Sequence, residues 1–429
     1  MTVTKPMNIG VTGLKAHEQA MGVVGDNIAN VNTIGFKHSR ARFEDVMGSA
    51  SNLRGQSGLG VRTLRTQQIF TQGSLKNTGV TTDLALSGSG FFVVQGNFNG
   101  QAGQFYTRNG QLSLLDGELV TSNGMNVMGY PAAPGGGFDA KLAAVDLSSA
   151  SLPPQPTSEL EIVANLDANE TPPAGPFDVN DPGATSSFST SVTVYDNQGT
   201  PHALDVFFVK GANPNEWDIH VLADASELTT PAPANAGDIY TEVASGTATF
   251  DGNGLLQTLP AMSASIQFNN SAAQTIDLNL GEPTAAGGTG MLGLTQYGSP
   301  SSINAQSQDG YAADDLNDIE ISSDGIVSGI FSNGQTLPMW RLAVATLQGQ
   351  EGLARAGGNL WAQTTDSGEP AIGGAAVGGR AAVISGALEQ STVDLTTQFV
   401  DMITYQRAFQ ASAKFISTVS DLLDILVNL

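Results

Sequence analysis

The chain has 429 residues and a formal net charge of −23, which comes from 40 acidic and 17 basic side chains. That balance argues against a nucleic-acid partner and against binding to an anionic membrane surface, because both need an excess of Lys and Arg. The absence of cysteine excludes disulfides, cysteine-ligated metals and cysteine nucleophiles. The sequence also lacks an uninterrupted apolar signal region and any long apolar run. We therefore expect a cytoplasmic protein, or one that is exported without a cleaved signal peptide.

Residues 1–37 begin with a helical pattern. Apolar side chains recur there at intervals of seven, which places them on one face of a helix. Several glycines each weaken this helix by up to about 1 kcal/mol, although small residues also let another helix approach closely. We predict a helix that needs a partner and that ends where Asn32 and Gly35 favour a turn. Its two apolar lines comprise Met7, Leu14, Met21 and Ile28, and then His17, Val24 and Val31.

Residues 38–69 are predicted to form an extended connecting arm. This stretch is polar and is the basic region of an acidic chain. No series of aromatic side chains accompanies it, as stacking on nucleic-acid bases would require. A contact with an acidic neighbour is therefore the favoured interpretation. Its basic side chains are His38, Arg40, Arg42, Arg54, Arg62 and Arg65.

Residues 70–145 and 303–370 share a strand pattern. Dipeptides such as Asp116-Gly117 and Asn123-Gly124 separate short apolar runs, and they are strong signals for β-hairpins. The runs at 112–115, 118–121 and 326–331 are candidate strands. We predict that the two stretches complete one discontinuous inner β-domain.

Residues 146–302 differ in composition and are predicted to be an inserted outer β-domain. Its candidate strands are short or alternate between polar and apolar side chains. The Gly-rich residues 371–385 are predicted to be a linker into the C-terminal helix. The candidate strands are 189–195, 203–209, 217–222, 246–250, 263–268 and 275–280.

Residues 386–429 carry the strongest pattern, a seven-residue apolar repeat typical of a coiled coil. A second line holds Phe399, Ala413 and Val427, with Gln406 and Ser420 as polar interruptions. A helix of about forty residues would be roughly 60 Å long and needs a partner. Residues 1–37 are the candidate, and an ordinary two-helix pair within one chain fits the same periodicity. The predicted seam comprises Met7, Leu14, Met21, Val24, Ile28, Leu388, Leu395, Phe399, Met402, Phe409, Ile416 and Leu423.

The predicted fold class is thus multidomain α+β. The N- and C-terminal helices form a coiled-coil domain, and two mainly-β domains are nested between them in the chain.

Candidate catalytic and ligand-binding motifs are weak. None of the four histidines, His17, His38, His202 and His220, forms a spaced metal pair, and we expect the last two to face solvent on strands. Residues 288–293 match a dinucleotide spacing, but no helical pattern follows them. Residues 314–318 lack the Gly and Glu of a calcium loop, so a solvated turn is favoured. We predict no catalytic, cofactor-binding or metal residues, and therefore no enzyme.

Several segments resemble the bacterial flagellar rod and hook proteins. Residues 29–37 are similar to the N-terminal signature of that family, and residues 386–395 and 399–411 are similar to its C-terminal signature. Residues 83–94 and 324–334 also resemble family segments, in the family's order. Thr392 stands where the family usually has Asn. The signature residues carried over are Asn30, Thr33, Gly35, Phe36, Gln406 and Arg407.

The resemblance implies a structural subunit rather than an enzyme. Rod members are usually much shorter, so the inserted domain favours the hook members, which form the curved tube between rod and filament. The partners implied are copies of the chain itself, rod, hook-cap and hook–filament junction proteins, and the type III export apparatus, with no nucleic acid, membrane or cofactor. The implied location is the extracellular hook.

Two alternatives remain open at this stage. One is a distal-rod-like subunit, and the other is a secreted β-rich adhesin with Trp217 or Trp361 as a sugar platform. For the hook subunit we expect protease-sensitive termini in the isolated chain around a resistant core of roughly residues 70–370.

Overall fold

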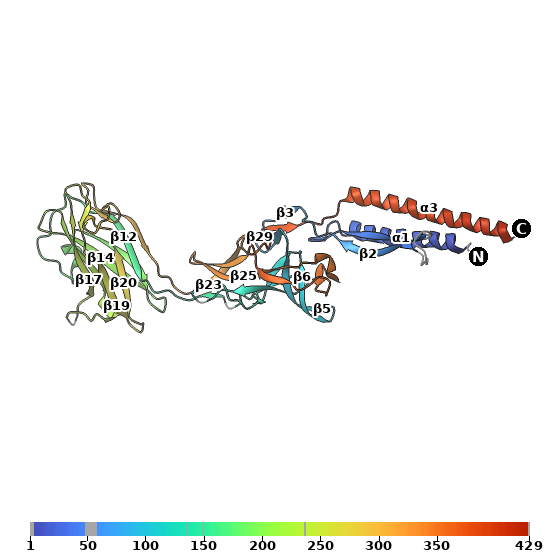
Figure 1. Cartoon of the computed structure of the whole chain (residues 1–429). Helices are drawn as coiled ribbons and strands as arrows, with labels where there is room; N and C mark the ends of the chain where they lie inside the picture. The colour runs from blue at the N-terminus through green and yellow to red at the C-terminus, as the bar shows by residue number, and fades with distance from the viewer. Residues whose placement is uncertain (1–3, 48–57, 134, 149, 236, 428–429) are drawn as a thin grey trace. The chain divides into compact units, whose positions relative to one another are not determined.

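The computed structural model describes residues 4–47, 58–133, 135–148, 150–235 and 237–427 (Figure 1). The chain divides into two compact units. The terminal unit contains residues 1–150, 317–330 and 336–429, and the inserted unit contains residues 151–316 and 331–335. Among the described residues, no helix combines the length and apolarity that crossing a membrane requires.

Two long helices and a hairpin make up one part of the terminal unit. Helix α1 spans Thr4–Ala29 and α3 spans Leu395–Val427. The predicted connecting arm is an antiparallel hairpin of β1 (Ser39–Met47) and β2 (Gly58–Gln68), whose register shifts after Arg42 and after Asp45. Strand β2 lies against α1, because a Cβ at Gly60 would lie 2.0 Å from the Thr12 hydroxyl.

The predicted start of the C-terminal helix, near residue 386, is wrong, because the helix begins at Leu395, about two and a half helical turns later. Residues Ala387–Glu389 form strand β30, which pairs with β3 (Leu75–Asn77). The helix begins only after Asp394, whose carboxylate accepts a hydrogen bond from the Thr396 N–H at 2.9 Å. Such a cap defines a helix start. Leu388 of the predicted seam therefore lies in a strand and not in the helix.

The rest of the terminal unit is one large sheet, whose central strands follow the order β24-β25-β9-β5-β6-β27-β26, and the two-stranded sheets β29-β4 and β3-β30. Hairpin β7–β8 turns at Asp116-Gly117, where both residues have positive φ (51° and 85°), as a tight hairpin requires. The apolar core of the large sheet includes Phe91, Tyr106 and Trp361. The strands are β4 (Leu84–Ser87), β5 (Phe91–Phe98), β6 (Gln101–Thr107), β7 (Leu112–Leu115), β8 (Glu118–Thr121), β9 (Asn126–Pro131), β10 (Ala143–Ala144), β23 (Asp314–Ile321), β24 (Ile326–Phe331), β25 (Thr336–Thr346), β26 (Ala354–Gly357), β27 (Leu360–Ala362), β28 (Ala371–Gly374) and β29 (Ala382–Ser385).

The predicted Gly-rich linker is also corrected. Strand β28 pairs with β25, and β29 pairs with β4, so much of 371–385 belongs to paired strands. Glycine serves close packing here: a Cβ at Gly374 would lie 2.5 Å from Nε of Arg341, and one at Gly373 would lie 2.6 Å from Cζ of Arg380. Side chains larger than hydrogen would displace both arginines.

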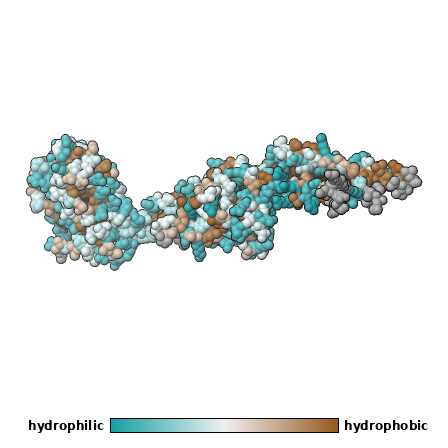
Figure 2. Space-filling model, in the orientation of Figure 1, coloured by the Kyte–Doolittle hydropathy of each residue, from teal (hydrophilic) through white to brown (hydrophobic). Residues whose placement is uncertain are grey.

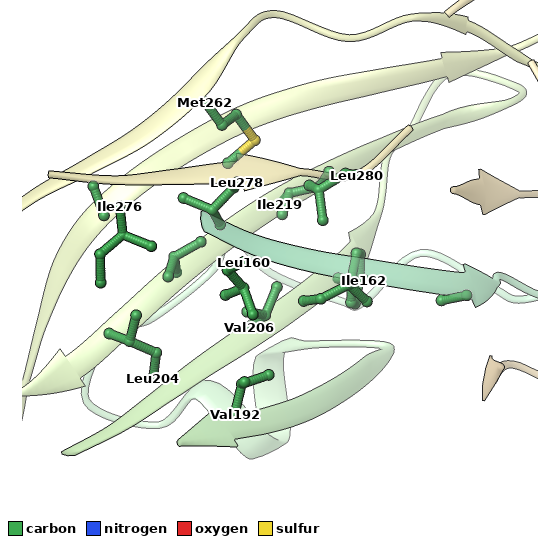
Figure 3. Packing of buried hydrophobic residues seen from close by; sticks show 14 of the residues in the cluster. Leu160, Ile162, Val192, Leu204, Val206, Ile219, Met262, Ile276, Leu278 and Leu280 are labelled. Carbon is green, nitrogen blue, oxygen red and sulfur yellow. The ribbon is translucent and has the colours of Figure 1, made fainter. Parts of the chain in front are cut away.

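The inserted unit packs two sheets around one apolar core (Figure 3). One sheet has the order β13-β14-β15-β17-β18, and the other has β16-β19-β20-β12-β21 with β22 beside β12. Alternate residues of β19 and β20 are buried, as in a sheet with one face on a core. The elements are β11 (Ser151–Leu152), β12 (Glu159–Asn165), α2 (Pro182–Thr185), β13 (Phe188–Tyr195), β14 (Pro201–Lys210), β15 (Glu216–Asp224), β16 (Leu228–Thr230), β17 (Tyr240–Phe250), β18 (Leu256–Thr258), β19 (Met262–Phe268), β20 (Gln274–Asn279), β21 (Leu294–Thr295) and β22 (Ser302–Gln308).

The predicted boundary at residue 303 differs from the structure. Strand β22 runs antiparallel to β12, from Leu160 opposite Gln308 to Asn165 opposite Ser302, so residues 303–308 belong to the inserted unit. The polar composition of β22 hides this, because most of its side chains face solvent.

Asp196 anchors the turn between β13 and β14 and gives a prediction for pH. Burial raises the pKa of its carboxyl, but N–H groups of Thr200 and Gln198 and the nearby His202 outweigh burial, so the pKa lies below its usual value. The ionised form therefore stabilises the folded unit above about pH 4, and this contribution is lost as pH falls through the lowered pKa. We expect Asp196→Asn to lower the melting temperature of the inserted unit at pH 6. The deficit should shrink between pH 4 and 2 in calorimetry, and exposed Asp181→Asn should show no such dependence.

Candidate assembly surface and the terminal junction

Helices α1 and α3 pack antiparallel along a seam that differs from the predicted one. A Cβ at Gly10 would lie 2.6 Å from Cγ1 of Ile416, and Asn27 Nδ2 donates to Gln398 Oε1 at 2.8 Å. The more buried positions of α3 alternate at spacings of four and three, which is the pattern of a helix pair. These positions are Gln398, Met402, Tyr405, Phe409, Ser412, Ile416, Val419 and Leu423.

Part of the predicted seam lies at this contact and part does not. Met402, Phe409, Ile416 and Leu423 are half-buried on the seam side of α3. Leu395 and Phe399 are 39% and 50% exposed. On the predicted second line Phe399, Gln406 and Ser420 are exposed, whereas the second line of the contact passes through Gln398, Tyr405 and Ser412.

On α1 the helix contact is made mainly by small residues. Val24 of the predicted seam is buried, but Leu14, Met21 and Ile28 are half-buried and Met7 is 40% exposed. Small residues let the two backbones approach closely, so a search for large apolar side chains selects the neighbouring face. The buried positions are Gly10, Gly13, Ala16, Ala20, Val24 and Asn27.

Asn27 is a buried hydrogen-bonding residue at the helix contact that the apolar pattern missed. It is fully buried and ties together α1, β1 and α3. Its Nδ2 donates to the Ser39 carbonyl at 2.7 Å and to Gln398 Oε1, and its Oδ1 accepts from the Ser39 N–H at 2.8 Å. Nearby, the rings of His17, Phe43 and Tyr405 lie with centroids 5.6–6.3 Å apart and join the same three elements. The sequence signal for this contact was a polar residue at a seam position of each helix, Asn27 on α1 and Gln398 on α3.

The side of α3 away from this contact carries an outer apolar face, which we define as Phe399, Val400, Ile403, Phe415, Leu422 and Ile425, with Phe415 at its edge beside Gly10 of α1. These side chains are 45–60% exposed. Figure 2 shows apolar surface along this helical part of the molecule. Exposed apolar side chains gathered along one helix are a common feature of surfaces that bind another protein.

The signature residues near the end of α1 shape its exit. Asn30 Nδ2 donates to the Asp26 carbonyl at 2.9 Å, and the Thr33 hydroxyl donates to Asn30 Oδ1 at 3.1 Å. Gly35 has φ +68°, and its position leaves no room for a Cβ beside the backbone of Arg108. Phe36 is buried beneath the Arg355 guanidinium. In contrast, Gln406 and Arg407 are exposed on α3 and are not brought to this site.

A buried charge network lies where both terminal segments meet the sheet. Glu389 is fully buried, and its Oε1 accepts from Lys37 Nζ at 2.6 Å and from the Gly73 N–H at 2.8 Å. Its Oε2 lies 3.3 Å from Nη1 of Arg108. Burial lowers the pKa of both Lys37 and Arg108, and the Glu389 carboxylate opposes that shift. No periodicity or motif in the sequence indicates this network.

The remaining motifs show no ligand site. Residues 288–293 lie between β20 and β21, without the helix that pyrophosphate binding needs. Residues 314–318 lie in strand β23, so the predicted turn is wrong. His220 lies opposite Phe207 rather than His202 in the register, and His202 is half-buried and stacked on Phe268 rather than facing solvent. Among the residues that the structure describes, no three His, Asp or Glu side chains gather as metal ligands.

The two tryptophans that the adhesin alternative needs as sugar platforms are packing residues. The Trp217 side chain is fully buried in the core of the inserted unit, and Trp361 is 5% exposed in the core of the terminal unit. A platform for a sugar needs an exposed ring face, so neither residue can serve as one.

Comparisons with known proteins agree with this arrangement. Residues 7–37 match the model for the flagella basal body rod protein, and residues 85–165 match the flagellar hook protein FlgE/F/G D1 domain. Residues 165–311 match the flagellar basal body protein FlaE D2 domain, and residues 384–429 match the flagellar basal body rod FlgEFG protein C-terminal model. The fold and these matches define the class as flagellar axial proteins with an inserted β-domain.

Full-length relatives narrow the class. The chain is 34% identical over 425 residues to the flagellar hook protein FlgE of Salmonella typhimurium, with 98% of each chain covered. It is 34% identical over 424 residues to that of Escherichia coli, and 32% identical over 465 residues to that of Treponema pallidum, again with 98% of each chain covered. The chain belongs to the flagellar hook protein family, FlgE. It is a structural subunit of the hook, and this family is not a family of enzymes.

Proposed function

We propose that copies of this chain polymerise through the terminal helices into a curved, flexible tube that transmits torque from rod to filament. The observation that carries the proposal is the outer apolar face of α3. Six large side chains remain exposed although the opposite side of the same helix already packs on α1. We assign this face to the α helices of neighbouring copies, in a coiled-coil-like packing around the tube axis.

We assign the inserted unit to contacts between neighbouring copies that rearrange as the tube rotates. Charged residues make up only 13% of the chain, so much of the surface is polar but uncharged. Contacts between such surfaces rearrange more readily than an interdigitated apolar core. A bent rotating tube needs this, because each row of subunits lengthens and shortens once per turn. The proposal extends to export by the flagellar type III apparatus to the cell exterior, and to rod, hook-cap and hook–filament junction proteins as partners.

We assign the exposed basic hairpin β1–β2 to contacts with acidic side chains. Arg42 lies directly opposite Arg65 in the register, and Arg65 lies 3.6 Å from Glu351. Like charges in register are unfavourable unless acidic groups lie near them. Glu351 of the same chain supplies one such group to Arg65, and we assign the remaining basic side chains to acidic groups of a neighbouring copy.

Electron microscopy of tubes assembled from the purified chain tests the proposal. We expect curved tubes. Straight tubes would instead favour a distal-rod-like subunit, which is the second candidate within the same class. A chain that stays monomeric at high concentration and under salting-out conditions would contradict both.

A further inference from the structure

Three chain segments contact the Glu389 carboxylate, through Lys37, Gly73 and Arg108. Besides accepting from Lys37 and Gly73, it lies against Arg108, whose Nη2 donates to the Gly88 carbonyl at 2.6 Å. Lys37 Nζ also donates to the Thr71 carbonyl at 2.6 Å. The side chains of Lys37, Arg108 and Glu389 are 1%, 5% and 0% exposed. The network is therefore sealed from water, where ion pairs are weakly screened and unpaired charges are costly.

Backbone hydrogen bonds also join the segment after α1 to the segment before α3. The Gly35 N–H donates to the Glu389 carbonyl at 2.8 Å, and the Thr392 N–H donates to the Phe36 carbonyl at 3.1 Å. The Thr392 hydroxyl lies 3.0 Å from the His38 N–H. The segment that leaves α1 thus binds largely to the segment that enters α3, and each provides hydrogen-bonding partners for the other.

The three buried charges of this network are not equivalent. Glu389 is the one anion of this network, whereas Lys37 and Arg108 are its two cations. Removal of Lys37 leaves a balanced Arg108–Glu389 pair. Removal of Glu389 leaves two buried cations side by side, so the network can close only after the segment carrying Glu389 has docked.

We propose that Glu389 is a positioning residue that makes the docking of the two terminal segments mutually dependent. Residues 35–38 dock on the sheet only when residues 387–392 are docked, and the reverse. Residues near the two ends of the chain therefore order together around one carboxylate. This coupling acts within a single chain, so the protease-resistant part of the isolated chain should extend to residues 35–40 and 387–392, beyond the core of roughly residues 70–370 that the sequence predicts.

Trypsin cleavage of the full chain in its isolated form tests the coupling. Cleavage after Arg40, followed by mass spectrometry, reports the undocking of the N-terminal segment. Glu389→Gln changes only the C-terminal segment, yet we expect it to speed cleavage after Arg40 by about 100-fold, because it leaves buried charges unpaired. Glu351→Gln removes the partner of a half-exposed ion pair and should cleave like the original chain.

A second variant separates charge coupling from loss of packing. In Lys37→Met, trypsin should cleave after Arg40 at nearly the rate seen in the original chain, since Arg108 and Glu389 remain paired. Lys37→Met combined with Glu389→Gln should cleave more slowly than Glu389→Gln alone, because one buried cation is removed. If the double variant cleaves as fast as Glu389→Gln or faster, the carboxylate is not a charge interlock. Equal cleavage of the original chain and Glu389→Gln after Arg40 would also overturn the proposal.

Discussion

Gly35→Ala is expected to release the segment that follows α1 from the sheet. At φ +68° an L side chain costs about 1–2 kcal/mol. The added Cβ would also lie 2.8 Å from the carbonyl carbon of Arg108 and from the nitrogen of Asn109. These are backbone atoms that cannot rotate away, so the segment itself must move and lose its hydrogen bond to the Glu389 carbonyl. We expect a total loss of about 3–5 kcal/mol in the stability of the docked junction.

Gly79→Ala is the matched control for this prediction. Gly79 has φ +72°, but a Cβ there would meet no atom within 4 Å. It therefore carries the backbone cost without the overlap. Urea unfolding of both variants, with cleavage after Lys37 as a local readout, gives the difference between the two. Equal losses in the two variants would show that the close approach at Arg108 contributes nothing.

The hairpins of the terminal unit could be predicted because their signals are local. The runs at 112–115, 118–121 and 326–331 are strands β7, β8 and β24 with the predicted bounds. Asp116-Gly117 determines its turn through residues that tolerate positive φ, and that chemistry lies within two positions of the chain. No distant contact is needed to infer it.

The start of α3 could not be predicted from periodicity. Leu388 falls on the seven-residue line by chance, whereas its neighbours pair with β3, more than 300 positions earlier. Long-range strand pairing leaves no local period. The same applies to residues 303–308, whose partner strand β12 lies about 140 positions away.

The residues of the helix contact could be predicted from local periodicity, but the buried charges of the terminal junction could not. Phe409 and Ile416 were found because apolar spacing reports a buried helix face. Lys37, Arg108 and Glu389 were not, because charged residues in a sequence are ordinarily assigned to the surface. Only the fold shows that their charges compensate one another.

Phe409→Asp is expected to abolish tube assembly while both β-rich units stay folded. Phe409 is half-buried at the contact of α3 with α1. The substitution removes an aromatic side chain from the seam and adds a carboxylate that loses hydration when the helices pair. We expect a cost of at least about 3 kcal/mol for helix pairing, which corresponds to about a 100-fold rise in the concentration needed for assembly.

Gln406→Asp is the control, because the sequence repeat also assigned Gln406 to the seam and the structure leaves its side chain exposed. The same charge there should leave helix pairing intact. Sedimentation measures assembly, far-ultraviolet circular dichroism measures helix content, and calorimetry follows the two β-rich units. Normal tubes from Phe409→Asp would refute the assembly role of the helix pair. An equal defect in Gln406→Asp would instead place the sensitive contact outside the seam, on the side of α3 that carries its outer apolar face.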